Sequence, residues 1–213
     1  MKLHYAPASP YARKVRAAAI ETGLGKAVEL VHATVAPGRE NQAYAGKINP
    51  LRKIPALELD GGEVLVDSTV ICEYLDAKAG GGKLLPKEGE ARWRVLTQHA
   101  IAQGMTDALL LVRYETALRP EPLRWPLWID DQFDKAWSGL NWFETRAADI
   151  LPSAPKQLDL AQLALGCVLG YLDFRFNDQG WRKRAPLVAE WFRAASALPS
   201  LAETVPYDPP PKT

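Results

Sequence analysis

The sequence is poor in the residues from which metal sites, disulfide frameworks and nucleotide-binding loops are built. Among 213 residues there are two cysteines and three histidines, and none of them has a Cys or His partner at the spacing of a zinc site. Cys72 and Cys167 lie in apolar stretches of helical period, which predicts buried, reduced thiols. The chain has neither a P-loop nor a Rossmann glycine fingerprint, so we expect no metal and no nucleotide.

An excess of charge of one sign is also lacking. Lys and Arg number 26 against 25 Asp and Glu, so the molecule has little long-range field to attract nucleic acid or an anionic membrane. The N-terminal residues form a short apolar run broken by His4 and Pro7, which is neither a signal sequence nor a membrane span. We therefore expect a cytoplasmic protein with no nucleic-acid partner and no membrane attachment.

The first eighty residues alternate strand and helix signals. Short apolar runs bounded by turn residues indicate strands, and apolar residues at steps of three and four indicate helices. Two short apolar runs around an Asp-Gly-Gly turn are typical of a β-hairpin. The polar stretch 37–49 gives no clear signal. The predicted order is a strand at 2–5, a helix from about Tyr11 to Thr22, a strand at 28–32, a hairpin at 54–66, and a helix that begins at Asp67-Ser68.

The remainder of the chain carries helix signals only. Gly80-Gly81-Gly82 ends the preceding helix, and we expect a first domain at 1–79, a linker at 80–87 and an all-helical domain at 88–213. Asp159 with Gln162 forms a capping box, which predicts a central, largely buried helix after it. Helices are expected at about 88–118, 122–151, 159–176 and 186–197, and the proline-rich tail 206–213 is expected to be extended or loose.

Four local motifs stand out along this order of elements. They are Ser9-Pro10-Tyr11 with Arg13-Lys14-Val15-Arg16; Asn49-Pro50-Leu51-Arg52-Lys53-Ile54-Pro55; Asp67-Ser68 with Ile71 and Glu73-Tyr74-Leu75; and the capping box from Asp159. With them the chain resembles the glutathione S-transferase superfamily along nearly its whole length, as a cytosolic, serine-type, bacterial-like member. The resemblance implies an α/β, thioredoxin-like N-terminal domain of order βαβ-ββα, followed by an all-α domain with the second-substrate pocket.

The resemblance implies that Ser9 is the catalytic residue. In the family, a Tyr, Ser or Cys at this position contacts the sulfur of glutathione, and a hydroxyl there stabilises the thiolate by donating a hydrogen bond. Ser9 would then be a donor, and the glutathione sulfur would be the nucleophile. Relatives with Cys at this position form mixed disulfides, which Ser9 cannot do. From composition alone Ser9 is a turn or N-cap serine, and Tyr11 is an alternative hydroxyl donor.

The resemblance also implies a glutathione-binding set. A cis bond between Ile54 and Pro55 would turn the Ile54 backbone outward to pair with the glutathione peptide, as a neighbouring strand would. The start of the helix at Asp67-Ser68 would hold the γ-glutamyl carboxylate through Ser68, with the Asp67 carboxylate near the ligand ammonium group. Lys53 would meet the glycyl carboxylate, and it fits an ordinary surface lysine equally well.

Other residues have two interpretations each. Arg13 and Tyr11 line the site, or Arg13 faces solvent and Tyr11 packs. Arg113 and Tyr114 bind the second substrate, or Arg113 pairs with Glu115 or Asp107. The dense tryptophans form an apolar pocket or, as we expect, a core; they are Trp125, Trp128, Trp137 and Trp142.

The function implied by the resemblance is that of a glutathione transferase in detoxification, with glutathione as co-substrate and a small electrophile as the second substrate. Two alternatives stay open at this point. One is a glutathione-binding carrier or interaction protein with little turnover, and the other is a glutathione-dependent isomerase or dehalogenase. The family also implies a homodimer.

Overall fold

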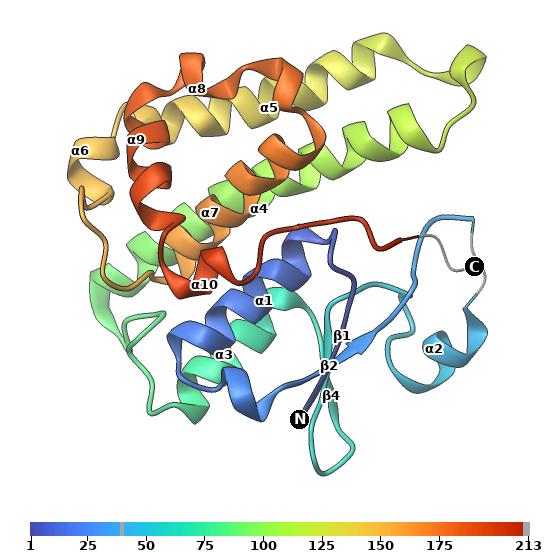
Figure 1. Ribbon diagram of the computed structural model, residues 1–213, viewed down its shortest axis with the longest axis vertical. Helices are drawn as coiled ribbons and strands as arrows, with labels where there is room; N and C mark the ends of the chain where they lie inside the picture. The colour runs from blue at the N-terminus through green and yellow to red at the C-terminus, as the bar shows by residue number, and fades with distance from the viewer. Residues whose placement is uncertain (39–40, 211–213) are drawn as a thin grey trace. The chain divides into compact units, whose positions relative to one another are not determined.

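The computed structural model describes residues 1–38 and 41–210, which form two compact units (Figure 1). Unit 1 consists of Met1–Arg92 and the described residues from Pro199 on, and unit 2 consists of Trp93–Leu198. Compactness thus divides the chain at Arg92 and groups the last described segment with unit 1. The division into domains at 1–79, 80–87 and 88–213 stays a prediction.

Unit 1 is built on a mixed sheet of four strands in the order β2-β1-β3-β4. β1 pairs parallel with β2 and antiparallel with β3, and β3 pairs antiparallel with β4. The parallel pair needs a crossover, which α1 supplies. This is the thioredoxin-like arrangement, so the predicted βαβ-ββα order is confirmed. The elements are β1 (Lys2–Tyr5), α1 (Pro10–Glu21), η1 (Gly25–Ala27), β2 (Glu29–His32), α2 (Gln42–Lys47), β3 (Ala56–Glu58), β4 (Val64–Leu65) and α3 (Ser68–Lys78).

Helices α1 and α3 pack against each other beside this sheet. Each presents an apolar stripe at helical spacing, because small and branched apolar residues recur every three or four positions. The sheet contributes Leu3 from β1 and Leu57 from β3, which lie opposite each other and are fully buried. The buried residues of the two helices include Ala12, Val15, Ala18, Ala19, Ile71, Cys72 and Leu75.

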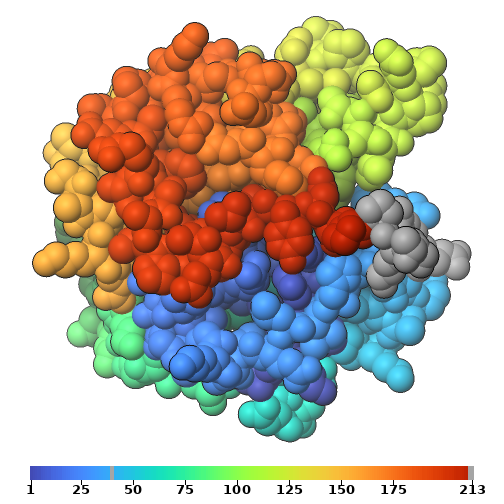
Figure 2. Space-filling model, viewed as in Figure 1, coloured from blue at the N-terminus to red at the C-terminus, as the bar shows by residue number. Residues whose placement is uncertain are grey.

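Two short helices in unit 1 were not predicted. α2 lies in the stretch that gave no clear signal, and Asn41 caps it by accepting a hydrogen bond from the Tyr44 N–H at 3.1 Å. α10 (Pro199–Ala202) packs against α1, and Figure 2 shows the described residues at the red end of the chain lying on blue residues. Helices of six and four residues are too short for an apolar period to be visible in the sequence.

One buried carboxylate holds the connection that follows α3. Asp76, near the end of that helix, accepts backbone hydrogen bonds from Gly82, Lys83, Leu84 and Leu85 at 3.0 to 3.3 Å. The three glycines at 80–82 all have positive φ, which lets the chain reverse and bring these N–H groups back to the carboxylate. Gly80-Gly81-Gly82 therefore ends α3 as predicted.

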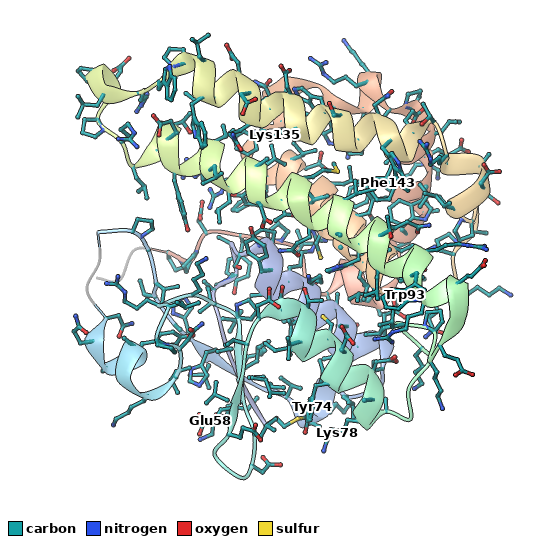
Figure 3. All side chains as sticks on the ribbon, turned by 180° about the vertical axis from the view of Figure 1, so that it is seen from behind. Glu58, Tyr74, Lys78, Trp93, Lys135 and Phe143 are labelled. Carbon is teal, nitrogen blue, oxygen red and sulfur yellow. The ribbon has the colours of Figure 1, made fainter. Side chains whose placement is uncertain are left out.

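All the regular secondary structure that the structure describes in unit 2 is helical. α7 is buried on nearly all sides, as a central helix should be, and its predicted capping box is present, with Asp159 and Gln162 each bonding the backbone of the other. Phe143 of α5 lies in the core (Figure 3). The elements are α4 (Gly89–Ala117), whose residues up to Arg92 belong to unit 1, η2 (Glu121–Leu123), α5 (Pro126–Glu144), α6 (Ala147–Ile150), α7 (Leu160–Arg175), η3 (Asn177–Gln179), α8 (Trp181–Arg184) and α9 (Pro186–Ala195).

Two predictions about unit 2 are wrong. The single helix expected at 122–151 is divided into η2, α5 and α6, because Pro126 starts a new helix and α5 ends at Glu144. The tryptophans at the start of α5 are not core residues. Trp125 is 59% exposed and stacks on Trp128 with ring centroids 6.3 Å apart. Their mutual stacking replaces part of the contact that a core would provide.

Cys72 and Cys167 are buried and form no disulfide, as predicted. The described residues after Thr204 have no regular secondary structure, in keeping with the extended tail predicted from Pro206 on, of which residues 211–213 lie outside the described range. Within the described ranges, no three His, Cys, Asp or Glu side chains gather where they could hold a metal ion. Among the same residues, no helix combines the length and the apolar character needed to cross a bilayer.

Candidate functional site

Ser9 lies in the turn between β1 and α1 and caps that helix. Its backbone is extended, and its Oγ accepts a hydrogen bond from the Ala12 N–H at 3.2 Å. Pro10 follows at the first helical position, where a missing N–H has no cost. The N-cap interpretation of Ser9 is therefore correct. Because Ser9 Oγ accepts a hydrogen bond from the helix backbone, its own hydroxyl proton can be donated to another acceptor. Capping α1 and donating a hydrogen bond to a ligand are therefore compatible roles.

The loop before β3 contains the cis peptide bond between Ile54 and Pro55, as predicted. The buried side chains of Tyr44 and Asn49 hold this loop in place. The Lys53 carbonyl accepts hydrogen bonds from the Tyr44 hydroxyl at 3.0 Å and from Asn49 Nδ2 at 2.8 Å. Asn49 Oδ1 in turn accepts from the Leu51 N–H at 3.0 Å. Burial raises the pKa of Tyr44 to about 12, so its hydroxyl is protonated and can donate at neutral pH.

The roles of Tyr44 and Asn49 were not predicted from the sequence. Asn49 was noted as part of a motif, but nothing in the sequence connected it with the Lys53 carbonyl. Tyr44 lay in a stretch with no predicted structure. A buried Asn is a signal worth following, since such a side chain needs several hydrogen-bond partners.

Ile54 stands just outside the sheet. The β1–β3 pairing runs from Lys2 with Glu58 to His4 with Ala56, so Ile54 lies two residues before the paired part of β3. An extended ligand can therefore pair with its backbone as an added strand. The neighbouring Lys53 side chain is exposed.

The beginning of α3 offers a second polar group. Asp67 is the N-cap, and its Oδ1 accepts hydrogen bonds from the N–H groups of Thr69 at 3.0 Å and Val70 at 3.5 Å. Ser68, the first residue of the helix, is 2% exposed. The predicted N-cap is confirmed. The Ser68 N–H belongs to the first turn of α3, where backbone donors and the helix dipole favour an anion.

The sheet brings these three segments to one end. β3 runs antiparallel to β1 and β4, so the turn after β1, the loop before β3 and the connection after β4 all leave the sheet on the same side. Ser9 follows β1, Ile54 precedes β3, and Asp67-Ser68 follows β4. The strand directions alone therefore place the three loops at the same end of the sheet (Figure 1).

Arg13 and Tyr11 lie on α1, one turn or less beyond Ser9. Arg13 is 4% exposed, so it does not face solvent. Its Nη2 donates to the Leu201 carbonyl at 3.1 Å, and its Nε donates to Thr204 Oγ1 at 3.4 Å. The Arg13 guanidinium thus contacts the C-terminal segment. Tyr11 is half-buried.

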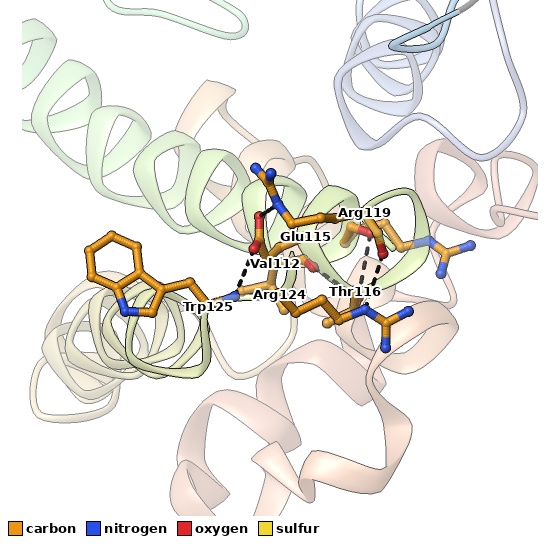
Figure 4. Close-up of polar contacts among 7 residues, drawn as sticks. Val112, Glu115, Thr116, Arg119, Arg124 and Trp125 are labelled. Carbon is orange, nitrogen blue, oxygen red and sulfur yellow. Dashed lines mark hydrogen bonds and ion pairs between the residues drawn. The ribbon is translucent and has the colours of Figure 1, made fainter. Parts of the chain in front are cut away.

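Arg113 and Tyr114 are half-buried on α4 in unit 2. Glu115, one of the partners considered for Arg113, is engaged elsewhere: it accepts from Arg119 Nε at 2.7 Å and from the Trp125 N–H at 3.0 Å (Figure 4). These hydrogen bonds hold the pKa of Glu115 below its usual value. Burial raises the pKa of the Tyr114 hydroxyl, so this side chain is neutral. Tyr114 directly follows Arg113 in the sequence.

A cavity of about 350 Å³ lies elsewhere in unit 1. It is lined by residues at the C-terminal end of α3 and in the connection after it, among them Glu73, Asp76, Lys87 and Arg92. Arg92 Nη2 and Glu73 Oε2 are 2.9 Å apart. The candidate residues are at the opposite end of α3, so this cavity is separate from them.

Comparison with known proteins identifies the same family in both halves of the chain. Residues 3–83 match the family model for the glutathione S-transferase N-terminal domain, and residues 126–194 match the model for the C-terminal domain. A curated relative, the GST-like protein YibF of Escherichia coli K12, is 29% identical, and the match covers 97% of this chain and 98% of the relative.

Solved structures are similar along the whole chain. A glutathione transferase family member from Pseudomonas fluorescens Pf-5 with bound glutathione is 44% identical, with a TM-score of 0.92, and covers 97% of this chain and 99% of its own. A structure from the same organism with bound S-(propanoic acid)-glutathione is 42% identical, with a TM-score of 0.86, over 98% of this chain and 100% of its own.

Proposed function

Because this chain belongs to the glutathione S-transferase family, we propose that it binds glutathione at the clustered loops of unit 1 and activates the glutathione thiol through Ser9. The activated sulfur attacks a small electrophile. The observation that carries this proposal is the hydrogen bond from the Ala12 N–H to Ser9 Oγ, which orients the hydroxyl so that its own proton is available to a thiolate.

Ser9 lowers the thiol pKa by stabilising the charged form. A hydroxyl donates one hydrogen bond to the thiolate sulfur, and the first turn of α1 adds partial positive charge at the same place. More thiolate is then present at neutral pH, and thiolate is the nucleophile. Ser9 itself forms no bond to the substrate. The sulfur lone pair forms the new bond to the electrophilic carbon, the electrophile's leaving group departs with the electron pair of the bond that breaks, and the thiol proton leaves to solvent.

The rest of glutathione is held by backbone and charge. The Ile54 N–H and C=O pair with the peptide of glutathione, with the loop kept in shape by Pro55, Tyr44 and Asn49. Ser68 and the first turn of α3 bind the γ-glutamyl carboxylate, and Asp67 lies near the ammonium group. Lys53 reaches the glycyl carboxylate as an exposed, mobile cation.

The second substrate binds in the helical domain, with Arg113 and Tyr114 as lining residues. A relative 42% identical to this chain was solved with S-(propanoic acid)-glutathione, a glutathione whose sulfur already carries a substituent. A site of this kind that accepts an S-substituted glutathione favours a transferase over a carrier that holds only free glutathione. We propose further that the protein acts as a homodimer, as the family does.

The test is a titration of bound glutathione followed by the ultraviolet absorbance of the thiolate. We expect the thiol of bound glutathione to ionise at lower pH than free glutathione, and Ser9→Ala to abolish this shift while retaining most of the binding. Conjugation to a small aromatic electrophile should fall about 10- to 100-fold in kcat/KM. Ser9→Thr, which keeps the hydroxyl, should retain a substantial part of both.

A matched control distinguishes a loss of thiol activation from a loss of folding stability. Ser9→Ala also removes an N-cap, at a cost of about 1 kcal/mol in the free energy of unfolding. Asp159→Ala removes the cap of α7 in unit 2 at a comparable cost and should leave the thiol ionisation unchanged. An equal thiolate signal in wild type and Ser9→Ala would reject the activating role. Binding without any thiolate signal in wild type would support the carrier alternative.

A further inference from the structure

Arg113 on α4 carries a half-buried guanidinium group. Among the residues that the structure describes, this group has no hydrogen-bond or ion-pair partner. The two carboxylates considered for it from the sequence bond elsewhere: Glu115 accepts from Arg119, and Asp107 accepts from Gln103 Nε2 at 3.3 Å. Partial burial of a charged group that has no partner costs free energy. An anion that binds to Arg113 would therefore be favoured.

A second helix of unit 2 brings further polar groups to Arg113. Tyr171 and Arg175 lie one turn apart on α7, and Arg175 hydrogen-bonds the Tyr171 hydroxyl. The positive charges of Arg175 and Arg113 both act on this hydroxyl, and Tyr114 interacts with it as well. α4 and α7 thus gather two guanidinium groups and two phenols inside unit 2 (Figure 1). We call Arg113, Tyr114, Tyr171 and Arg175 the arginine–tyrosine cluster.

Both phenols of the cluster are neutral. Tyr171 is 3% exposed, and burial raises its pKa to about 12, although the charges of Arg175 and Arg113 act in the opposite direction. Burial also raises the pKa of Tyr114. A protonated phenol can donate a hydrogen bond to an anion, and it carries no negative charge that would repel one.

The carboxylates next to the cluster in the sequence are already paired. Glu115 follows Tyr114 and forms an ion pair with Arg119. Asp173 lies between Tyr171 and Arg175, where its Oδ2 accepts from Arg182 Nη2 at 2.7 Å and its Oδ1 accepts from Trp181 Nε1 at 2.8 Å. The charges of Glu115 and Asp173 are thus balanced by other cations.

We propose that Arg113 binds a carboxylate group of the second substrate, so that the protein prefers small electrophiles that carry a carboxylate. A guanidinium fork matches the two oxygens of a carboxylate, and the Tyr114 hydroxyl adds a neutral donor beside it. Because Arg175 is bonded to Tyr171, Arg113 is the cation that meets the ligand, and its single charge balances one carboxylate. This inference rests on the proposed function, to which it adds the charge of the substrate.

The test compares S-substituted glutathiones by calorimetry, because each is the product that a matching electrophile would leave. S-carboxymethylglutathione and S-(4-carboxybenzyl)glutathione carry a carboxylate at a short and at a longer distance from the sulfur. Each is paired with the carboxamide of the same shape, S-carbamoylmethylglutathione or S-(4-carbamoylbenzyl)glutathione. Wild type should bind the acid of at least one pair about tenfold more tightly than its amide, since hydrogen bonds to a charged group are the stronger ones.

Variants assign this preference to one side chain. Arg113→Gln should reduce the affinity for the acid to that for the amide, while the amide and free glutathione bind as they do to wild type. Arg113→Lys keeps the charge but not the fork and should retain part of the preference. Arg124→Gln is the matched control, because Arg124 is another half-buried arginine of unit 2, whose Nε donates to the Arg119 carbonyl at 3.2 Å. It should keep the full preference.

The outcomes separate this inference from the proposed function. If wild type binds neither free glutathione nor any of the four ligands, the proposed function fails, and the carboxylate site fails with it. If wild type binds the ligands without preferring either acid, only the carboxylate site is rejected.

Three results with the variants would also reject the role of Arg113. A preference that persists in Arg113→Gln would belong to another cation. An equal loss of preference in Arg113→Gln and Arg124→Gln would indicate the general field of unit 2. An equal loss of affinity for acid and amide in Arg113→Gln would indicate a structural role.

Discussion

Two polar side chains of the candidate site, Ser9 and Asp67, each accept a structural hydrogen bond that can coexist with a ligand. Ser9 caps α1 through a lone pair of Oγ and keeps its proton for another acceptor. Asp67 caps α3 through Oδ1, and a carboxylate has a second oxygen. In the proposed function these groups are already oriented before glutathione binds, so less conformational entropy is lost on binding.

Tyr44 permits a test of the site loop through pH. Its pKa is about 12 against an ordinary 10.0, so above pH 10 the unfolded chain loses this proton while the folded protein keeps it. Stability therefore falls as pH rises from about 10 to 12, by up to about 2 kcal/mol. Tyr44→Phe should remove that alkaline loss, and at neutral pH it should cost about 1 kcal/mol because the Lys53 carbonyl loses a donor.

The measurement for Tyr44 is urea unfolding of wild type and variant at several pH values from 7 upward. Tyr207→Phe, which changes an exposed phenol, is the control and should follow the wild-type curve. Parallel pH curves for wild type and Tyr44→Phe would contradict the prediction. Glutathione affinity should also fall a few-fold in Tyr44→Phe, since the loop that carries Ile54 is held by one donor in place of two.

At the scale of elements, a helix could be predicted from the sequence where a capping residue at its start is followed by a long apolar period. Asp67 and Asp159 are capping residues followed by long apolar periods, and the helices after them begin at the next residue, as expected. α2 has a cap, Asn41, but too few residues for a period. The loop at 49–55 was predicted from its motif, yet its support by Tyr44 depends on one hydrogen bond between residues nine apart, and such a contact leaves no periodic pattern in the sequence.

The packing of α4 against α5 can be tested with two glycines. A Cβ on Gly139 of α5 would lie 2.5 Å from Met105 Cγ and 2.9 Å from its Sδ, and Met105 is buried on α4. Gly139→Ala should therefore overpack this crossing and destabilise the protein by about 1–3 kcal/mol. Gly104 of α4 has nothing within 4 Å of a new Cβ, so Gly104→Ala should stabilise by about 0.5–1 kcal/mol through helix propensity.

Urea unfolding of both glycine variants measures the difference directly. The pair is well matched, since each substitution adds one methyl group inside a long helix of unit 2. Gly139→Ala with unchanged or increased stability would show that Met105 moves aside at no cost.

At the scale of the molecule, the chain passes from unit 1 to unit 2 and back. Helix signals along the sequence indicated an all-helical second half, and this is confirmed. The return of residues from Pro199 on to unit 1 could not be predicted, because it depends on Arg13 meeting Thr204 and Leu201 across nearly the full length of the sequence. A short segment of mixed composition carries no periodic signal for the unit against which it packs.

The proposed homodimer gives the last prediction. Trp93, at the beginning of unit 2, is 66% exposed (Figure 3), and exposed tryptophans are enriched at protein interfaces because they bury a large apolar area. Wild type should sediment at twice the mass of one chain, and Trp93→Arg should shift the equilibrium toward monomer by at least about tenfold in dissociation constant. Leu187→Arg places the same charge at a similarly exposed apolar residue on α9 and is the control, expected to remain dimeric. A monomeric wild type would reject the dimer, whereas a dimeric Trp93→Arg protein would show that the interface lies elsewhere on the surface.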